Sequence, residues 1–167
     1  MSDLDPQVLR LGLDTLATIS SLRDGLLDRF PENFGGLYNR GDSRTFVVLT
    51  VGDDAGLREF TSAHLADFTS DDPAIAARLP RVVFQPATRP LRLLIDLQDR
   101  IFAERDELSR RGIVFHAVGV RDDVNRVLAF VAAPNQEDAR QLLLDRYGDG
   151  VEIQIGTFIF RRNPQMY

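Results

Sequence analysis

The chain of 167 residues contains no cysteine. That absence excludes thiol nucleophiles, disulfide bonds and zinc sites built from thiolates. Stability must therefore come from packing, and a domain of this length buries roughly 70% of the surface that its unfolded chain exposes. The sequence needs neither a disulfide nor a structural metal in order to fold.

Lysine is absent as well, and all 20 cationic side chains are arginines. Without lysine there is no amine for a Schiff base and no ammonium group for a phosphate-binding loop. The arginines are spread along a chain with a net charge of −5 rather than gathered in a run. Because binding to phosphate backbones depends on clustered positive charge, we expect no nucleic-acid partner.

Long apolar runs are also missing. No stretch approaches the roughly 18 residues that a membrane-spanning helix requires. The acidic start Met1–Pro6 has neither the basic nor the apolar region of a secretory signal. We therefore expect a cytoplasmic protein without a membrane partner.

The pattern of apolar residues predicts an α+β fold with two ββαβ-like halves in a single compact unit. An N-terminal amphipathic helix is expected within residues 1–32, with Pro6 at its first position. Its apolar stripe consists of Leu9, Leu13, Leu16, Ile19, Leu22, Leu26 and Phe30. The parts that follow are a first half (33–88), a connecting helix (89–112), a second half (113–160) and a tail (161–167).

The first half is predicted to contain a hairpin, a helix and a further strand. β-Branched residues on both sides of its second strand indicate that both faces of that strand are buried. Asp53 or Asp54 can cap the helix that follows. The predicted elements are strands at Phe34–Tyr38 and Arg44–Val51, a helix at about 55–68, a helical turn led by Pro73 and a strand at Arg81–Gln85.

The connecting helix is expected to run from Pro90 to Arg111, with Gly112 as a left-handed cap after its end. Apolar residues recur along one side of it. These are Leu91, Leu94, Ile95, Ile101, Phe102 and Leu108.

The second half repeats the order of the first. Its predicted elements are strands at Ile113–Val120 and Arg126–Ala133, a helix from Pro134 with Ala139, Leu142, Leu143 and Tyr147 on its apolar face, and a half-exposed strand at Val151–Ile155. An offset of 82 residues, from Arg44 to Arg126, aligns hairpin and helix without a gap. We expect helices on one face of largely antiparallel sheet. Whether the two halves share one sheet stays open.

The residues that could carry chemistry have simpler structural roles. His116 shares one face of a predicted strand with Val114, Val118 and Val120, and His64 shares a helical stripe with Leu57 and Phe60, so both are expected to be structural. The acidic pairs, at positions 53–54, 71–72 and 122–123, all fall at turns or helix starts, where aspartate satisfies free N–H groups. We expect no catalytic set, no metal site and no cofactor.

Two hairpins resemble those in the prodomains of α-lytic-protease and streptogrisin-type serine proteases. The first is Phe34-Gly-Gly-Leu-Tyr38 with Phe46-Val-Val-Leu-Thr50, and the second is Val118–Val127 with the Leu-Ala-Phe-Val that follows. The helix Pro90–Gly112 is similar to the one between the two halves of those prodomains. The resemblance covers about residues 33–156.

The resemblance implies a function in binding. In that family the prodomain assists the folding of its own protease and inhibits it, through a three-stranded sheet and a C-terminal tail. Carried over, the strands starting at Ile113, Arg126 and Val151 would form the docking sheet, and the tail from Thr157 to Tyr167 would enter the substrate cleft. We expect a stand-alone relative with another partner, without the export signal and the following protease of that family.

Our leading hypothesis is a non-enzymatic protein- or peptide-binding module that uses a sheet face, a sheet edge or the tail. An exposed strand ending at Ile155 could also pair with a copy of itself and form a homodimer. The candidate partner-binding residues are Phe158, Phe160, Arg161, Arg162 and Tyr167.

Two alternatives stay open. One is a small-molecule sensor that holds an anion between the two halves, with Arg89, Arg92 and Arg121 as candidate ligands. The other is an enzyme that depends on carboxylates or on His64 and His116.

Overall fold

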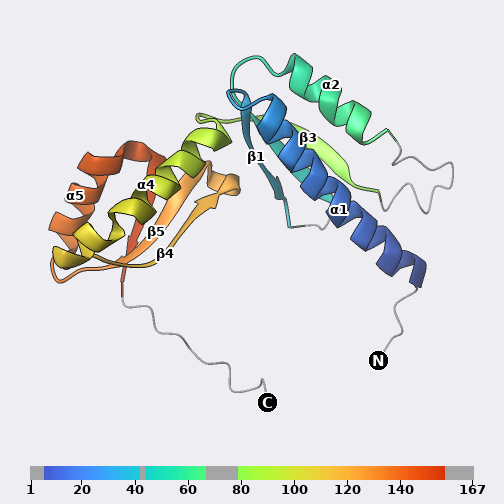
Figure 1. Cartoon of the computed structure of the whole chain (residues 1–167). Coiled ribbons are helices and arrows are strands. Elements are labelled where there is room, and N and C mark those ends of the chain that lie inside the picture. Colours follow the sequence, from blue (N-terminus) through green and yellow to red (C-terminus); the bar gives the residue numbers. More distant parts are fainter. Residues whose placement is uncertain (1–5, 42–43, 67–78, 157–167) are drawn as a thin grey trace. The chain divides into compact units, whose positions relative to one another are not determined.

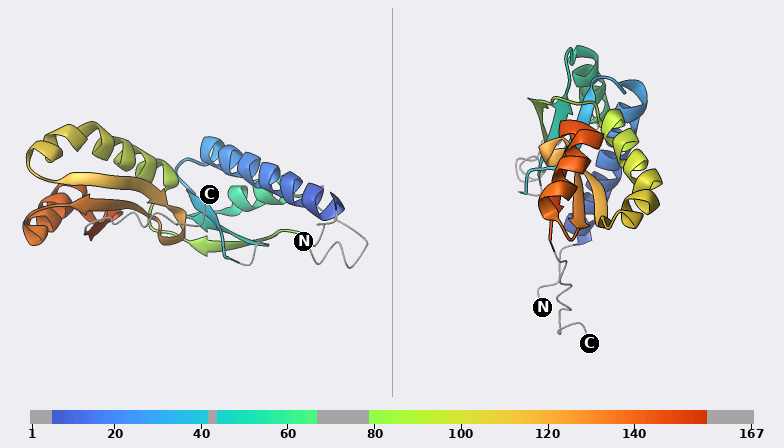
Figure 2. Two further views of the ribbon diagram at one scale, coloured as in Figure 1. Left: turned by 90° about the horizontal axis from the view of Figure 1, so that it is seen from below. Right: turned by 90° about the vertical axis from the view of Figure 1, so that its left-hand side faces the viewer.

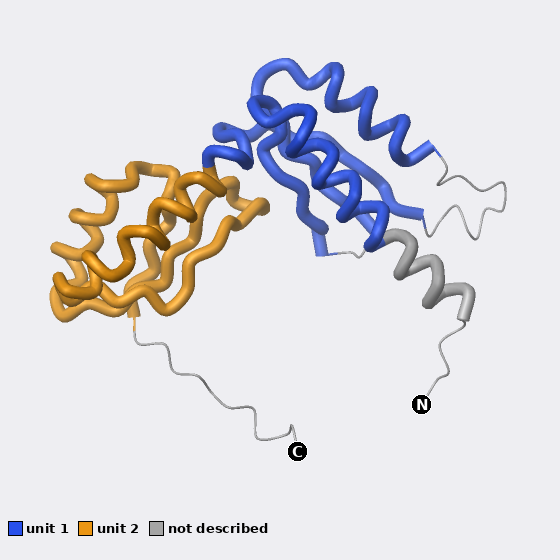
Figure 3. Tube along the Cα trace, viewed as in Figure 1, with its two compact units in different colours: residues 1–93 blue, residues 94–167 orange. Residues whose placement is uncertain are grey.

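The computed structural model describes residues 6–41, 44–66 and 79–156, with side chains from residue 16 onward. The fold is α+β, as the sequence predicts (Figure 1). The chain divides into two compact units, Met1–Leu93 and Leu94–Tyr167 (Figure 3). The predicted Pro73 turn, the acidic pair at 71–72 and the tail from Thr157 lie outside the described residues.

In its described residues, the first unit contains one three-stranded sheet and the helices α1 and α2, which contact each other through aromatic side chains. Phe30, just after α1, and Phe60, on α2, have ring centroids 5.9 Å apart. The strand order is β1-β2-β3, with β1 antiparallel and β3 parallel to β2. The elements are α1 (Pro6–Arg29), β1 (Phe34–Asn39), β2 (Thr45–Thr50), α2 (Ala55–His64) and β3 (Arg81–Pro86).

The apolar stripe of α1 is confirmed in its C-terminal part. Ile19, Leu22 and Leu26 are buried, and Phe30 is half-buried. Leu16 is 65% exposed, so the prediction that it belongs to the buried stripe is wrong.

β2 is buried on both faces, as its β-branched composition predicts. Phe46, Val47, Val48 and Leu49 follow one another in the strand, and all are buried. Because successive side chains point to opposite faces of a sheet, neither face is open to solvent here. The helix after β2 is shorter than predicted in the described part of the chain, and Asp53 Oδ1 accepts a hydrogen bond from its first residue, Ala55.

The second unit contains a second three-stranded sheet, so the two halves do not share one sheet. Its order is β4-β5-β6, again with one antiparallel and one parallel pair. The expectation of largely antiparallel sheet is thus corrected to mixed sheets. The elements are α4 (Leu91–Arg110), β4 (Val114–Arg121), η1 (Asp122–Val124), β5 (Arg126–Ala132), α5 (Gln136–Tyr147), η2 (Gly148–Gly150) and β6 (Val151–Ile155).

α4 begins at the end of the first unit and lies mostly in the second. Leu94, Ile101 and Leu108 are buried at spacings of seven, which is one face of a helix. Phe102 was predicted to share this face but is 47% exposed, because one residue turns the helix by about 100°. Gly112 has φ +82° and ends the helix in the left-handed conformation, as predicted.

The two halves are similar, but their hairpins align at an offset of 81 residues rather than 82. The register places Phe34 opposite Thr50, and Phe115 opposite Val131. Each hairpin has a bulge directly after that pair, at Gly35 and at His116. The buried faces of α2 and α5 keep the predicted offset, so the gapless alignment is wrong by one residue between strand and helix.

Within the described ranges, no helix is both long enough and apolar enough to cross a membrane.

Candidate binding face on the second sheet

The second sheet has a covered face and an outward face. α4 and α5 pack against the covered face (Figure 2). That face carries Phe115, Val118 and Val120 of β4, Val127, Ala129 and Val131 of β5, and Val151, Ile153 and Ile155 of β6. Since side chains alternate along a strand, the remaining residues of the three strands point outward.

The strand register identifies the outward residues, because partners in adjacent strands share a face. Val114 lies opposite Ala132, Ala117 opposite Phe130, and Gly119 opposite Leu128. On the other side of β5, Leu128 faces Glu152 and Phe130 faces Gln154. We call this surface the outward face; it consists of Val114, Ala117, Gly119, Arg121, Arg126, Leu128, Phe130, Ala132, Glu152 and Gln154.

The outward face has an apolar middle and a charged end. Val114 is 43% exposed, Ala117 is exposed and Leu128 is half-buried. Arg121 and Arg126 lie opposite each other at the hairpin end, next to Glu152 on β6. An apolar patch with a charged rim is the composition that protein interfaces favour.

Arg121, a predicted anion ligand, is already paired in this structure. Its Nε donates to Asp123 Oδ1 at 2.6 Å, and its Nη2 donates to the second oxygen of the same carboxylate. This pairing lowers the pKa of Asp123 and raises the pKa of Arg121. An incoming anion would therefore have to compete with a carboxylate for this guanidinium.

Side chains from the two helices occupy both edges of the second sheet. Gln98 Oε1, on α4, accepts a hydrogen bond from Val120 N–H of β4 at 3.0 Å. Arg140 Nη1, on α5, donates to Ile153 O of β6 at 3.2 Å. β4 is further interrupted by the bulge at His116. Native proteins close sheet edges in such ways, and the outward face is left as the open surface of this sheet.

The first sheet provides an internal comparison. At the offset of 81 residues, Val47 corresponds to Leu128 and Leu49 to Phe130. Val47 and Leu49 are 0% and 5% exposed, whereas Leu128 and Phe130 are both half-buried. The neighbouring strands β3 and β6 show the same contrast in polarity. The apolar Val83 of β3 lies beside Val47, whereas the charged Glu152 of β6 lies beside Leu128. The same face of the repeated fold is thus buried in one unit and partly exposed in the other.

A polar network joins α4 to α5 on the covered side of the sheet. Arg146 Nε donates to Glu104 Oε2 at 2.6 Å, and Tyr147 O–H donates to the same oxygen at 2.7 Å. Arg146 also binds both carboxylate oxygens of Glu107, and Arg100 donates to Arg146 O at 2.8 Å.

The ionisation of this network favours a structural role. Burial alone would raise the pKa of Glu104, but the hydrogen bonds from Tyr147 and Arg146 outweigh it, and the pKa lies below its ordinary value. The hydrogen bonds from Arg146 lower the pKa of Glu107. Burial and the neighbouring Glu104 carboxylate raise the pKa of Tyr147. Near pH 7 each group holds its ordinary charge, whereas general acids and bases have pKa values near the working pH.

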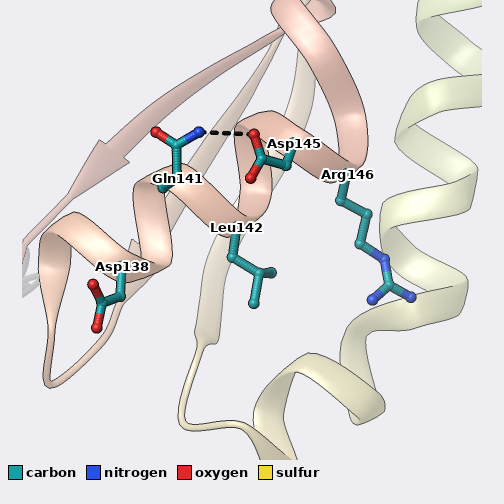
Figure 4. Close-up of a pocket in the computed structure, with 5 residues that line it drawn as sticks. All are labelled: Asp138, Gln141, Leu142, Asp145 and Arg146. Atoms are coloured by element: carbon teal, nitrogen blue, oxygen red, sulfur yellow. Dashed lines mark hydrogen bonds between the residues drawn. The ribbon is translucent and has the colours of Figure 1, made fainter.

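A shallow hollow of about 600 Å³ lies on the outer side of α5 (Figure 4). Its lining residues are Asp138, Gln141, Leu142, Asp145 and Arg146. Gln141 Nε2 donates to Asp145 Oδ1 at 2.7 Å, and Arg146 points toward α4. Ligand sites enclose most of a small molecule, so this open hollow is a weaker candidate than the outward face.

The two histidines belong to different units. His64, on α2, is half-buried with its ring 5.7 Å from that of Phe60, which confirms its predicted place at the margin of the core. His116 was predicted to share a face with Val114, Val118 and Val120, but it is the bulge residue of β4 and is exposed. The bulge breaks the alternation on which that prediction rested. No group of three acidic or histidine side chains within the described residues could hold a metal ion.

The remaining predicted site residues fall in two places. Arg89 and Arg92 belong to the first unit, where Arg89 Nη1 donates to Thr88 Oγ1 at 3.0 Å, while Arg121 belongs to the second. An anion site between the units stays a prediction. The predicted tail residues Phe158, Phe160, Arg161, Arg162 and Tyr167 lie outside the described residues.

The edge-closing side chains Gln98 and Arg140 and the exposed Ala117 were not identified from the sequence. One signal does point to the face: Glu152 and Gln154 alternate with Val151, Ile153 and Ile155, which marks one side of β6 as outward. Comparison of the chain with models of known protein families and with curated proteins finds no match in either.

Proposed function

We propose that this protein is a binding module that docks a protein partner on the outward face of the second sheet. One observation carries the proposal: the equivalent face is buried in the first unit and partly exposed in the second, where it has an apolar middle and a charged end. The edges of the second sheet support it, because Gln98 and Arg140 already occupy main-chain groups that strand addition would need.

The resemblance to protease prodomains supplies a candidate partner. Those prodomains present a three-stranded sheet to the protease, and the corresponding strands here are β4, β5 and β6. We propose a protease of the α-lytic or streptogrisin type, or a protein of similar surface, as the partner. In this proposal the tail from Thr157 to Tyr167 adds contacts of its own through Phe158 and Phe160.

Inhibition of a streptogrisin-type protease by the whole chain tests the proposal. Leu128→Asp and Ala117→Asp place a charge in the apolar middle of the face, and each should weaken inhibition at least tenfold, the equivalent of about 1.4 kcal/mol. Leu144→Asp is the matched control, because Leu144 is an exposed apolar residue on α5. Equal inhibition by all three variants would show that the protease does not bind on the outward face. A second chain truncated after Gly156 measures the contribution of the tail separately.

The alternative of an anion sensor is tested by melting. A ligand that binds the native state and not the unfolded state raises the melting temperature, and the rise grows with the logarithm of the ligand concentration above its dissociation constant. Phosphate or citrate should then stabilise the chain, and Arg89→Met should remove that effect. No shift at millimolar anion would exclude this alternative.

A further inference from the structure

The outer edge of β6 carries main-chain groups of alternate residues. Gly156 N–H donates to Val131 O of β5 at 3.0 Å, so the groups of Gly156 point toward β5. Main-chain groups alternate in direction along a strand. Those of Val151, Ile153 and Ile155 therefore point away from β5, and within the described residues β5 is the neighbour that β6 pairs with.

The main-chain carbonyl of Ile153, the central residue of these three, already accepts a hydrogen bond from a side chain. Arg140 Nη1 donates to Ile153 O at 3.2 Å, so the guanidinium lies along the edge where a further strand would approach. Gln98 acts in the same way at Val120 N–H, on the opposite edge of the sheet. In the described part of the chain, each edge thus carries a hydrogen bond from a helical side chain and no further strand.

The sequence of β6 suits antiparallel pairing with an identical strand. With Ile153 at the centre of a two-fold axis, Val151 lies opposite the copy's Ile155, so two apolar residues meet. Glu152 then lies opposite the copy's Gln154, so a carboxylate meets an amide and not a like charge. A two-fold interface of this kind is closed and self-complementary.

We propose that the outer edge of β6 is a latent pairing site for a second copy of this chain and that Arg140 keeps it closed. When Arg140 leaves Ile153 O, the outward N–H and C=O groups of the strand can pair with those of the copy. The proposal is independent of the binding function, because substitutions on the outward face leave these groups unchanged.

Arg140→Met tests this, because methionine keeps an apolar stem and removes the donors. We expect the self-association constant, measured by sedimentation equilibrium, to rise on the order of tenfold over that of the wild-type chain. Arg105→Met is the matched control, since Arg105 is an exposed arginine on α4 outside the outward face, and it should leave the constant unchanged. Arg140→Gln, with a shorter side chain, should behave as Arg140→Met does.

A second substitution separates edge pairing from other association. Ile155→Pro removes an outward N–H and is tolerated on an edge strand. Added to Arg140→Met, it should return self-association to the wild-type constant, with the folded state checked by circular dichroism. Wild-type self-association in both Arg140 variants would overturn the proposal. So would an increase that Ile155→Pro does not reverse.

Discussion

Arg146 of α5 and Glu107 of α4 form a two-armed ion pair, with 3.1 Å from Nη1 to Oε1 and 2.9 Å from Nη2 to Oε2. The same guanidinium binds Glu104, which also accepts a hydrogen bond from Tyr147. These contacts connect residues that lie far apart in sequence, on the two helices that cover the second sheet. The network therefore fixes the spacing of α4 and α5.

The first prediction concerns the stability that this network supplies. Arg146→Met should lower the free energy of unfolding of the second unit by about 1–2 kcal/mol, because it removes several charge-assisted hydrogen bonds at partly exposed positions. Arg111→Met is the control, since Arg111 makes one exposed contact of 3.3 Å with Glu107 and should change stability by less than about 0.5 kcal/mol. Urea denaturation of both variants measures the difference, and equal losses would contradict a special role for Arg146.

The second prediction concerns the free energy of unfolding at acid pH. The folded-state pKa values of Glu104 and Glu107 lie below their ordinary 4.5. Their contribution to stability is therefore complete above pH 4.5 and is lost as the pH falls through the folded-state values. Unfolding free energies of the wild-type chain should decline below pH 4.5 more steeply than those of Arg146→Met. Parallel curves would show that the network does not carry this pH dependence.

At alkaline pH, the free energy of unfolding should fall because Tyr147 ionises. Its pKa lies above the ordinary 10.0, because burial and Glu104 disfavour the phenolate. The tyrosine contributes stability that is complete below pH 10.0 and is lost as the pH rises further. Tyr147→Phe should flatten the decline above pH 10.0, which denaturation at matched ionic strength can measure. An unchanged decline would assign it to other groups.

The next prediction concerns the bulge of the first hairpin. A Cβ on Gly35 would lie 2.8 Å from Ala87 Cβ and 3.1 Å from Leu49 Cβ. Gly35→Ala should therefore destabilise the first unit by about 1–3 kcal/mol through overpacking. Gly119→Ala, where a Cβ meets nothing within 4 Å, is the control and should be close to neutral.

A double substitution tests the cause of that loss. Ala87→Gly removes the nearest atom, so the pair Gly35→Ala and Ala87→Gly should be more stable than the two single effects combined. Thermal unfolding of all four chains gives the coupling energy. Strict additivity would mean that backbone conformation, and not space, requires glycine at this bulge.

Sequence patterns were sufficient for the elements whose burial is strongly periodic. The alternation of Val151, Ile153 and Ile155 with polar residues predicts β6 as observed, and the β-branched run in β2 predicts burial on both faces. Helix ends followed from local chemistry, as with Gly112 after α4 and Asn135, whose Oδ1 accepts from Asp138 N at 3.3 Å at the start of α5.

The register and the edges could not be derived from periodicity. A bulge at His116 adds one residue to β4, which moves every later side chain to the other face, so the predicted valine face around His116 was wrong. The contacts of Gln98 and Arg140 with sheet edges depend on how the helices pack on the strands. No local pattern encodes such contacts, because they join residues 22 and 13 positions apart.

The same substitution at equivalent positions of the two halves should have unequal effects. Val47 and Leu128 occupy corresponding outward positions, but Val47 is 0% exposed and Leu128 is half-buried. Val47→Asp buries an unpaired charge and should cost more than about 4 kcal/mol, enough to unfold the first unit. Leu128→Asp keeps its carboxylate in water and should cost about 1 kcal/mol or less. Hydrogen exchange of the β2 and β5 amides measures each unit separately. Loss of protection in β5 on Leu128→Asp would mean that the outward face is covered, and a covered face could not dock a partner.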